Sequence, residues 1–193
     1  MYRRHWWPAH DAINRAWIAS VQTLVDRWGK RLAARIAGSY GQSWPALPHP
    51  VDVSVQAGPV GAYTTRPPHS TISSMEVHGL KALEIVFHEA SHQWGKALAD
   101  DIRESAARAN KTVPRNLWHA VLFHDDGEIT RRVLEEDGWG GYQEYAAGGT
   151  IYRDFCGDGC RDRIAAAWDP FLDGKRTRKE AIDALVASWP QGK

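Results

Sequence analysis

Residues 84–94 contain two histidines four positions apart, His88 and His92, with Glu89 directly after the first. This spacing constrains the local fold, because positions i and i+4 share one face of an α-helix and both imidazoles can then reach one ion. Glu89 is rotated about 100° from His88, which places its carboxylate beside that ion. We therefore expect a helix through this segment with a metal site on one face.

Two imidazoles and a third nitrogen or oxygen ligand suit zinc, which lowers the pKa of a bound water to about 7. Glu89 would then be placed to take a proton from that water. The alternative is a helix with two surface histidines and an unrelated glutamate. The apolar residues that flank the motif favour the metal site.

The composition is that of an ordinary globular protein. Of the 193 residues, 43% are hydrophobic and 24% are charged, and the formal net charge is +1. This length predicts one domain over residues 1–193 with a sizeable core. A charge so close to zero gives no electrostatic case for nucleic acid or an anionic membrane, and no apolar run approaches the roughly 18 residues of a membrane span. We expect neither partner.

The two cysteines, Cys156 and Cys160, enclose a short glycine-rich loop. They could form a disulfide in an oxidising compartment or remain two free thiols. The first eight residues hold basic side chains with no apolar stretch behind them, so they do not read as a signal peptide. The cysteine pair favours an exported protein, periplasmic or secreted, whose leader is not part of this sequence.

Apolar side chains recur at steps of three and four over residues 11–36, which predicts a long amphipathic helix. Pro8 should stop any helix upstream of it. Residues 51–136 then hold a small mixed sheet and the metal-site helices, and residues 137–193 hold a loop and C-terminal helices. The chain is therefore expected to have an α+β fold.

Three short strands are expected in the sheet, at residues 51–55, 61–65 and 69–74. A capping box formed by Ser73 and Glu76 predicts that the motif helix begins at about residue 74 and runs to about residue 100.

A second capping box, formed by Thr177 and Glu180, predicts the start of the last helix. Residues 161–168 read as a short helix, whereas five glycines between residues 138 and 149 indicate an irregular loop.

Residues 116–136 are predicted to be mostly helical and carry three candidates for the third ligand, His119, His124 and Glu128. On one straight helix His119 and Glu128 are about 900° apart and face opposite ways, whereas His124 and Glu128 share a face. His119 would then reach the ion only if the helix broke near Gly127.

We choose Glu128, because Gly127 beside it would let the motif helix approach closely. Arg131 and Arg132 offer the alternative, in which Glu128 forms a surface ion pair. Glu84, one turn before the first motif histidine, is either an acceptor near the site or a solvated side chain.

The motif, followed on a later helix by a carboxylate, resembles the gluzincin zinc metallopeptidases over residues 51–136. The resemblance implies a zincin-like domain with zinc ligands His88, His92 and Glu128 and with Glu89 as general base. The metzincin continuation, with a third histidine soon after the motif, is absent. A thermolysin-like member would have Asn before the ligand glutamate and Asp four residues after it, where this chain has glycine and arginine.

The resemblance implies hydrolysis of peptide bonds, with an extended substrate paired along an edge strand at residues 69–74. We assign the oxyanion donor to His119, with His124 and Tyr145 as alternatives. One rival function is a zinc-stabilised binding protein without activity, in which four protein ligands close the site. Another is a zinc hydrolase that acts on a non-peptide ester or amide.

Overall fold

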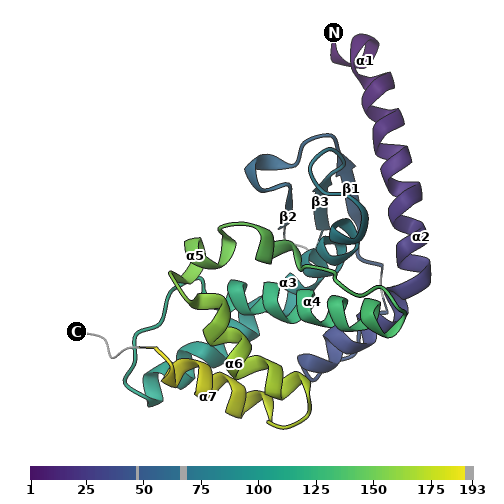
Figure 1. Ribbon diagram of the computed structural model, residues 1–193. Coiled ribbons are helices and arrows are strands. Elements are labelled where there is room, and N and C mark those ends of the chain that lie inside the picture. Colours follow the sequence, from purple (N-terminus) through teal and green to yellow (C-terminus); the bar gives the residue numbers. More distant parts are fainter. Residues whose placement is uncertain (47, 66–68, 190–193) are drawn as a thin grey trace.

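The computed structural model describes residues 1–46, 48–65 and 69–189. This part of the chain forms an α+β fold of seven α-helices and a three-stranded mixed sheet, which confirms the expected class (Figure 1). The helices are α1 (Tyr2–His5), α2 (Trp7–Ser39), α3 (Gly79–Arg108), α4 (Leu117–Glu136), α5 (Ile151–Cys156), α6 (Cys160–Leu172) and α7 (Arg178–Ala187). The strands are β1 (Val51–Ser54), β2 (Ala62–Thr65) and β3 (His69–Ser73), and two short 3₁₀ turns are η1 (Gly58–Val60) and η2 (Tyr145–Gly148). No helix in these ranges is long and apolar enough to cross a membrane.

The sheet has the order β1-β3-β2, with β1 parallel and β2 antiparallel to the central strand. All three strands lie where the sequence predicts them, but residues 69–74 were wrongly assigned to an edge. The strand there has hydrogen-bonded neighbours on both sides, with Ile72 opposite Val53 on β1 and Ala62 on β2. The unpaired edges of the described sheet are therefore those of β1 and β2.

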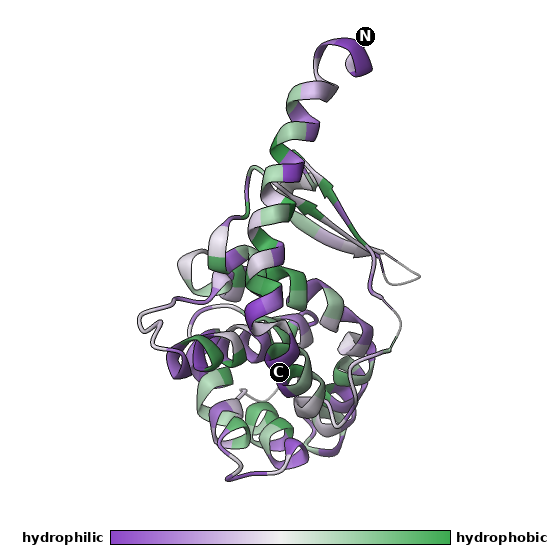
Figure 2. Cartoon of the chain, turned by 90° about the vertical axis from the view of Figure 1, so that its right-hand side faces the viewer, coloured by the Kyte–Doolittle hydropathy of each residue, from purple (hydrophilic) through white to green (hydrophobic). Residues whose placement is uncertain are grey.

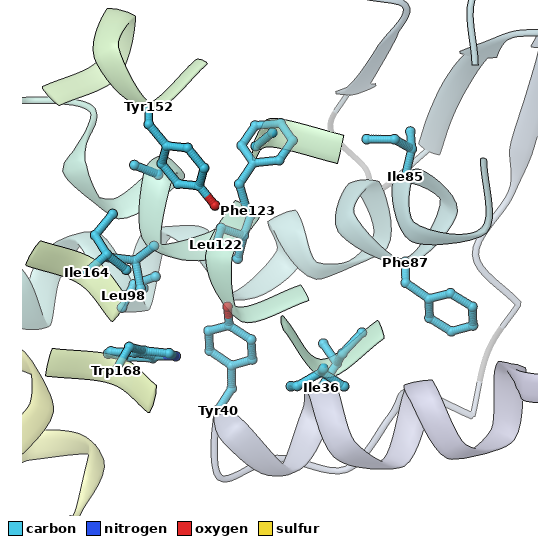
Figure 3. Close-up of a cluster of buried hydrophobic side chains, with 14 of the residues drawn as sticks. Ile36, Tyr40, Ile85, Phe87, Leu98, Leu122, Phe123, Tyr152, Ile164 and Trp168 are labelled. Atoms are coloured by element: carbon cyan, nitrogen blue, oxygen red, sulfur yellow. The ribbon is translucent and has the colours of Figure 1, made fainter. Parts of the chain in front are cut away.

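One hydrophobic core joins α2, α3, α4, α6, α7 and the sheet. Figure 3 shows side chains from several of these elements in one buried cluster, among them Ile36 of α2 and Trp168 of α6. The indole of Trp17 donates a hydrogen bond to the carbonyl of Val77, 2.6 Å away, and so ties α2 to the segment before α3. The N-terminal turns of α2 extend beyond the rest of the molecule (Figure 2).

Several helix boundaries differ from those predicted. Pro8 lies in the first turn of α2, where backbone N–H groups have no acceptor within the helix, so its lack of an N–H costs no hydrogen bond. The prediction that Pro8 stops any helix upstream is wrong, because α1 lies directly before α2. Ser73 Oγ accepts a hydrogen bond from the backbone N–H of Glu76, as the capping box predicts, but this caps a turn and α3 begins only at Gly79.

The C-terminal part follows the sequence more closely. The capping box between Thr177 and Glu180 is present and opens α7, as predicted. The short helix expected at residues 161–168 is longer, Cys160–Leu172, and α5 was not predicted. A disulfide joins Cys156 at the end of α5 to Cys160 at the start of α6.

Candidate metal centre

Three histidines converge between α3 and α4. His88 and His92 lie one turn apart on α3, as the motif predicts, and His119 reaches them from the first turn of α4. The Nε2 atom of His88 is 3.3 Å from Nε2 of His92 and 3.3 Å from Nε2 of His119. One nitrogen from each ring lies within 4.8 Å of the others.

This geometry fits a zinc ion. Zn–N bonds of 2.0–2.1 Å at tetrahedral angles place two ligand nitrogens about 3.3–3.4 Å apart, which matches the distances from Nε2 of His88 to the other two rings. Ligand imidazoles must also be neutral. Burial lowers the pKa of His88 to about 3. Burial and then His88 lower the pKa of His92 to about 3, and burial and then both of these imidazoles lower that of His119 to about 2. The three rings are therefore neutral at pH 7.

A buried carboxylate orients the central ring. Asp126 Oδ2 lies 3.2 Å from His88 Nδ1 and also accepts a hydrogen bond of 2.7 Å from Ser91 Oγ. A proton on Nδ1, donated to this carboxylate, leaves Nε2 free to bind a metal. Asp126 is fully buried, and burial raises its pKa well above the usual range. A cation at the three histidines would favour its charged form.

Glu89 lies beside the histidine cluster, as predicted. One of its carboxylate oxygens is 4.0 Å from His92 Nε2, and the same oxygen accepts a hydrogen bond of 2.6 Å from the hydroxyl of Thr64 on β2. Burial raises the pKa of Glu89 to about 7, although the Thr64 hydrogen bond acts in the opposite direction. The carboxylate is thus held near the site and titrates close to neutral pH.

The structure does not bring Glu128, chosen as third ligand from the sequence, to the histidine cluster. Its carboxylate accepts hydrogen bonds of 2.6 Å and 2.8 Å from Arg131 and of 2.7 Å from Arg132. Burial alone would raise the pKa of Glu128, but these arginines lower it. The ion-pair alternative holds, and Glu128 lies outside the group of residues that can share one ion.

The helix that carries His119 is unbroken from Leu117 to Glu136. The prediction that His119 reaches the site only if this helix breaks near Gly127 was therefore wrong. Its N-terminal turns pack against α3 on the face of His119, and Asp126, seven residues later, lies on the same face. Glu128 points to the other side. His124 also lies away from the cluster, with its Nε2 atom 2.7 Å from a carboxylate oxygen of Asp169 on α6.

Glu84 is a fully buried acceptor one turn before the motif, not a solvated side chain. Its carboxylate accepts hydrogen bonds from the hydroxyl of Tyr142, at 2.6 Å, and from the backbone N–H of Tyr145, at 3.0 Å. Burial raises its pKa to about 8. A side chain at Gly127 would meet Glu144 at 2.8 Å and Glu84 at 3.2 Å, so this glycine makes room for the loop that Glu84 anchors.

Aromatic rings surround the third histidine. The ring of His119 stacks on Trp118, with centroids 4.8 Å apart, and on Phe155 of α5, also at 4.8 Å. The indole of Trp118 occupies the space beside Gly95 on α3, where an added Cβ would meet it at 2.6 Å. The small residue one turn after the motif therefore allows the tryptophan to pack against the site.

Sequence reasoning missed several residues that contact the site, among them Asp126, Thr64 and Trp118. Of these three, only Asp126 had a usable signal, its seven-residue spacing from His119 on one helix. The contacts of Thr64 and Trp118 depend on how separate elements pack. Comparison of the chain with protein-family models, with curated proteins and with solved structures found no match, so the interpretation of this centre rests on its own geometry.

Proposed function

We propose that the protein is a zinc-dependent hydrolase that cleaves peptide bonds, with His88, His92 and His119 as zinc ligands in a zincin-like arrangement. The observation that carries the proposal is a cluster of three histidines, with the carboxylate of Glu89 beside it. In the described part of the chain no fourth side chain joins the cluster. A structural zinc site normally has four protein ligands, whereas a catalytic site has three and keeps one position open. This count argues against the inactive binding protein.

When bound, zinc supplies a Lewis acid at the scissile carbonyl and lowers the pKa of the attacking water to about 7. Glu89 accepts the proton of that water and passes it to the leaving amine. Burial raises its pKa above the ordinary value, and a cation at the three histidines would favour the charged form that accepts the proton. Thr64 holds the carboxylate at its position through the oxygen that lies 4.0 Å from His92 Nε2.

The oxyanion donor is reassigned, because His119 now serves as a ligand. Tyr145 is the remaining candidate on the loop anchored by Glu84. Its side chain is half-buried, and its pKa is raised by burial and then by the carboxylates of Glu76, Glu84 and Glu89. The hydroxyl therefore stays protonated. The ring of Tyr145 stacks on Phe123, with centroids 6.2 Å apart, and Phe123 stacks on His88 at 3.7 Å. Such a donor contributes roughly 2.7–4 kcal/mol to catalysis.

A peptide substrate is favoured over another ester or amide by the position of β2. This strand pairs with β3 on one side only, and its Thr64 contacts Glu89 directly. An extended peptide paired with the unpaired edge of β2 would pass beside the general base. The edge proposed for substrate binding is thus β2, in place of residues 69–74.

The test is the substitution Glu89→Gln, which keeps the size and shape of the side chain but removes the base. We expect it to retain about one zinc per chain and to lose at least a hundredfold of the hydrolysis of a mixed peptide library. Loss of zinc from this variant would show that Glu89 is a ligand. A zinc-loaded wild type that cleaves no peptide in the library would refute the proposed function.

A further inference from the structure

A groove with a volume of about 670 Å³ adjoins the metal centre. One wall is the C-terminal half of α3, and the other is the segment that leads from α3 into α4. The groove is lined by Ala99, Ile102, Arg103, Ala106, Ala107, Lys111, Thr112, Val113, Pro114, Arg115, Asn116 and Trp118.

Both walls continue from elements that carry the histidines. On α3, Ala99, Ile102 and Ala106 follow His92 at steps that keep them on the same helix face. On the other side, the lining ends at Trp118, next to His119 in sequence. The indole of Trp118 stacks on His119 and meets the ring of His92 edge-on, with centroids 5.9 Å apart. The groove and the metal centre therefore share this tryptophan as a common wall.

The lining combines an apolar surface with positive charge. Three of the lining residues are basic, Arg103, Lys111 and Arg115, and none of the lining residues is acidic. Lys111 is fixed by a hydrogen bond of 2.6 Å to the backbone carbonyl of Trp189. Arg103 bonds to Asp100 at 2.7 Å, but its side chain is 73% exposed and this pair contributes little. The groove thus has a positive charge and an apolar wall.

We propose that this groove binds an acidic segment of an extended peptide substrate, which gives the enzyme a preference for carboxylates on one side of the cleaved bond. The inference rests on the proposed function, because the peptide must also reach the histidines. From His92 to Arg103 is 11 residues of helix, or about 16 Å at 1.5 Å per residue. An extended peptide covers this distance in about five residues. The preferred carboxylate therefore lies about five residues from the cleaved bond.

The first experiment measures binding without turnover. The zinc-loaded Glu89→Gln protein is titrated against a rhodamine-labelled ten-residue peptide of alternating Leu and Glu, and against the same peptide with Lys in place of Glu. We expect the Glu peptide to bind at least tenfold more tightly and its affinity to fall as salt is added, because exposed charges are screened. Equal affinity for the two peptides would overturn the inference.

The second experiment reverses the groove charges. The single variant Arg115→Glu and the double variant, Arg103→Glu combined with Arg115→Glu, should both weaken binding of the Glu peptide. We expect the double variant to weaken it by roughly tenfold. Arg15→Glu is a matched control, because Arg15 is also highly exposed, at 76%, and bonds to a carboxylate, that of Asp11 at 2.8 Å, but lies on α2 and does not line the groove. Zinc content and circular dichroism establish that each variant is folded. An equal loss in Arg15→Glu would refute the role of the groove.

Failure of the inference can be distinguished from failure of the proposed function. If wild type cleaves Glu and Lys versions of a peptide at equal rates, the hydrolase proposal stands and the groove has no role in specificity. If neither peptide is cleaved while the Glu peptide still binds with the expected charge dependence, the groove proposal stands as a binding site and the hydrolase proposal fails.

Discussion

Substitution of Gly95 by alanine tests the packing that positions the third histidine. Gly95 lies inside α3, where alanine is favoured over glycine by about 0.8–1.0 kcal/mol. The added Cβ would meet the six-membered ring of Trp118 at 2.6 Å, which is too close for any real contact. The indole is rigid and must move as a whole, and overpacking of this kind costs about 1–3 kcal/mol.

Gly38→Ala is the matched control. Gly38 also lies in a helix, α2, and an added Cβ there would meet nothing within 4 Å. Both substitutions replace glycine by alanine in a helix, so the gain in helix propensity cancels when their changes in unfolding free energy are subtracted. The difference then reports the clash with Trp118. We expect Gly38→Ala to raise the free energy of unfolding by up to about 1 kcal/mol and Gly95→Ala to lower it by up to about 2 kcal/mol.

The free energies are measured by urea denaturation followed by far-UV circular dichroism. A difference of 1 kcal/mol corresponds to roughly 2–4 °C in Tm for a protein of this size. Displacement of Trp118 also removes the stacking contact of His119, so zinc affinity should fall by about tenfold in Gly95→Ala, as for other groups that orient a ligand. Equal stabilisation by both substitutions, with unchanged zinc affinity, would refute the packing argument.

Two further predictions concern the ligand set and a buried acid. His119→Ala should weaken zinc binding by more than a hundredfold, whereas Glu128→Ala should leave it within a fewfold and lower stability through the loss of its arginine pairs; the opposite result in a chelator competition assay would restore the glutamate ligand. In the folded protein the pKa of Glu84 is raised to about 8, so the folded state keeps the Glu84 proton to a higher pH than the unfolded state does. The contribution of Glu84 to stability therefore declines as pH rises from about 4.5 to 8. Glu84→Gln cannot ionise, and its stability relative to wild type should therefore improve across this window, with a slope of up to about 1.4 kcal/mol per pH unit; a difference that stays constant between pH 4.5 and 8 would show that the acid is not perturbed.

The sequence by itself determined the local features of the site. The positions of His88, Glu89 and His92 relative to one another follow from the rotation per residue of a helix, which needs no tertiary contact. The capping box at Thr177 is equally local, because its donors and acceptors lie within one turn. The three strands could be placed because alternation and breakers are also short-range signals.

Only the tertiary structure decided which of the candidate residues joins His88 and His92. His119 lies on one face of the unbroken helix α4, and His124 and Glu128 lie on the opposite one, so only one of these two faces can meet α3. Which face meets α3 depends on the rotation of α4 about its axis, and that is set by packing across the whole core. Gly127 was misread for the same reason, because its close neighbours, Glu84 and Glu144, come from α3 and from the loop after α4.

The order of the strands was likewise decided by tertiary structure. Alternation identifies each strand but not its neighbours. Here β1 pairs with β3, although β2 lies between them in the sequence. Hydrogen bonds between strands are made by the backbone, which is the same at every residue, so side-chain pattern alone cannot select the partner. The contact between Thr64 and Glu89 follows from this order, since it requires β2 to lie beside α3. Local geometry therefore specified the motif, and long-range packing specified which residues complete it.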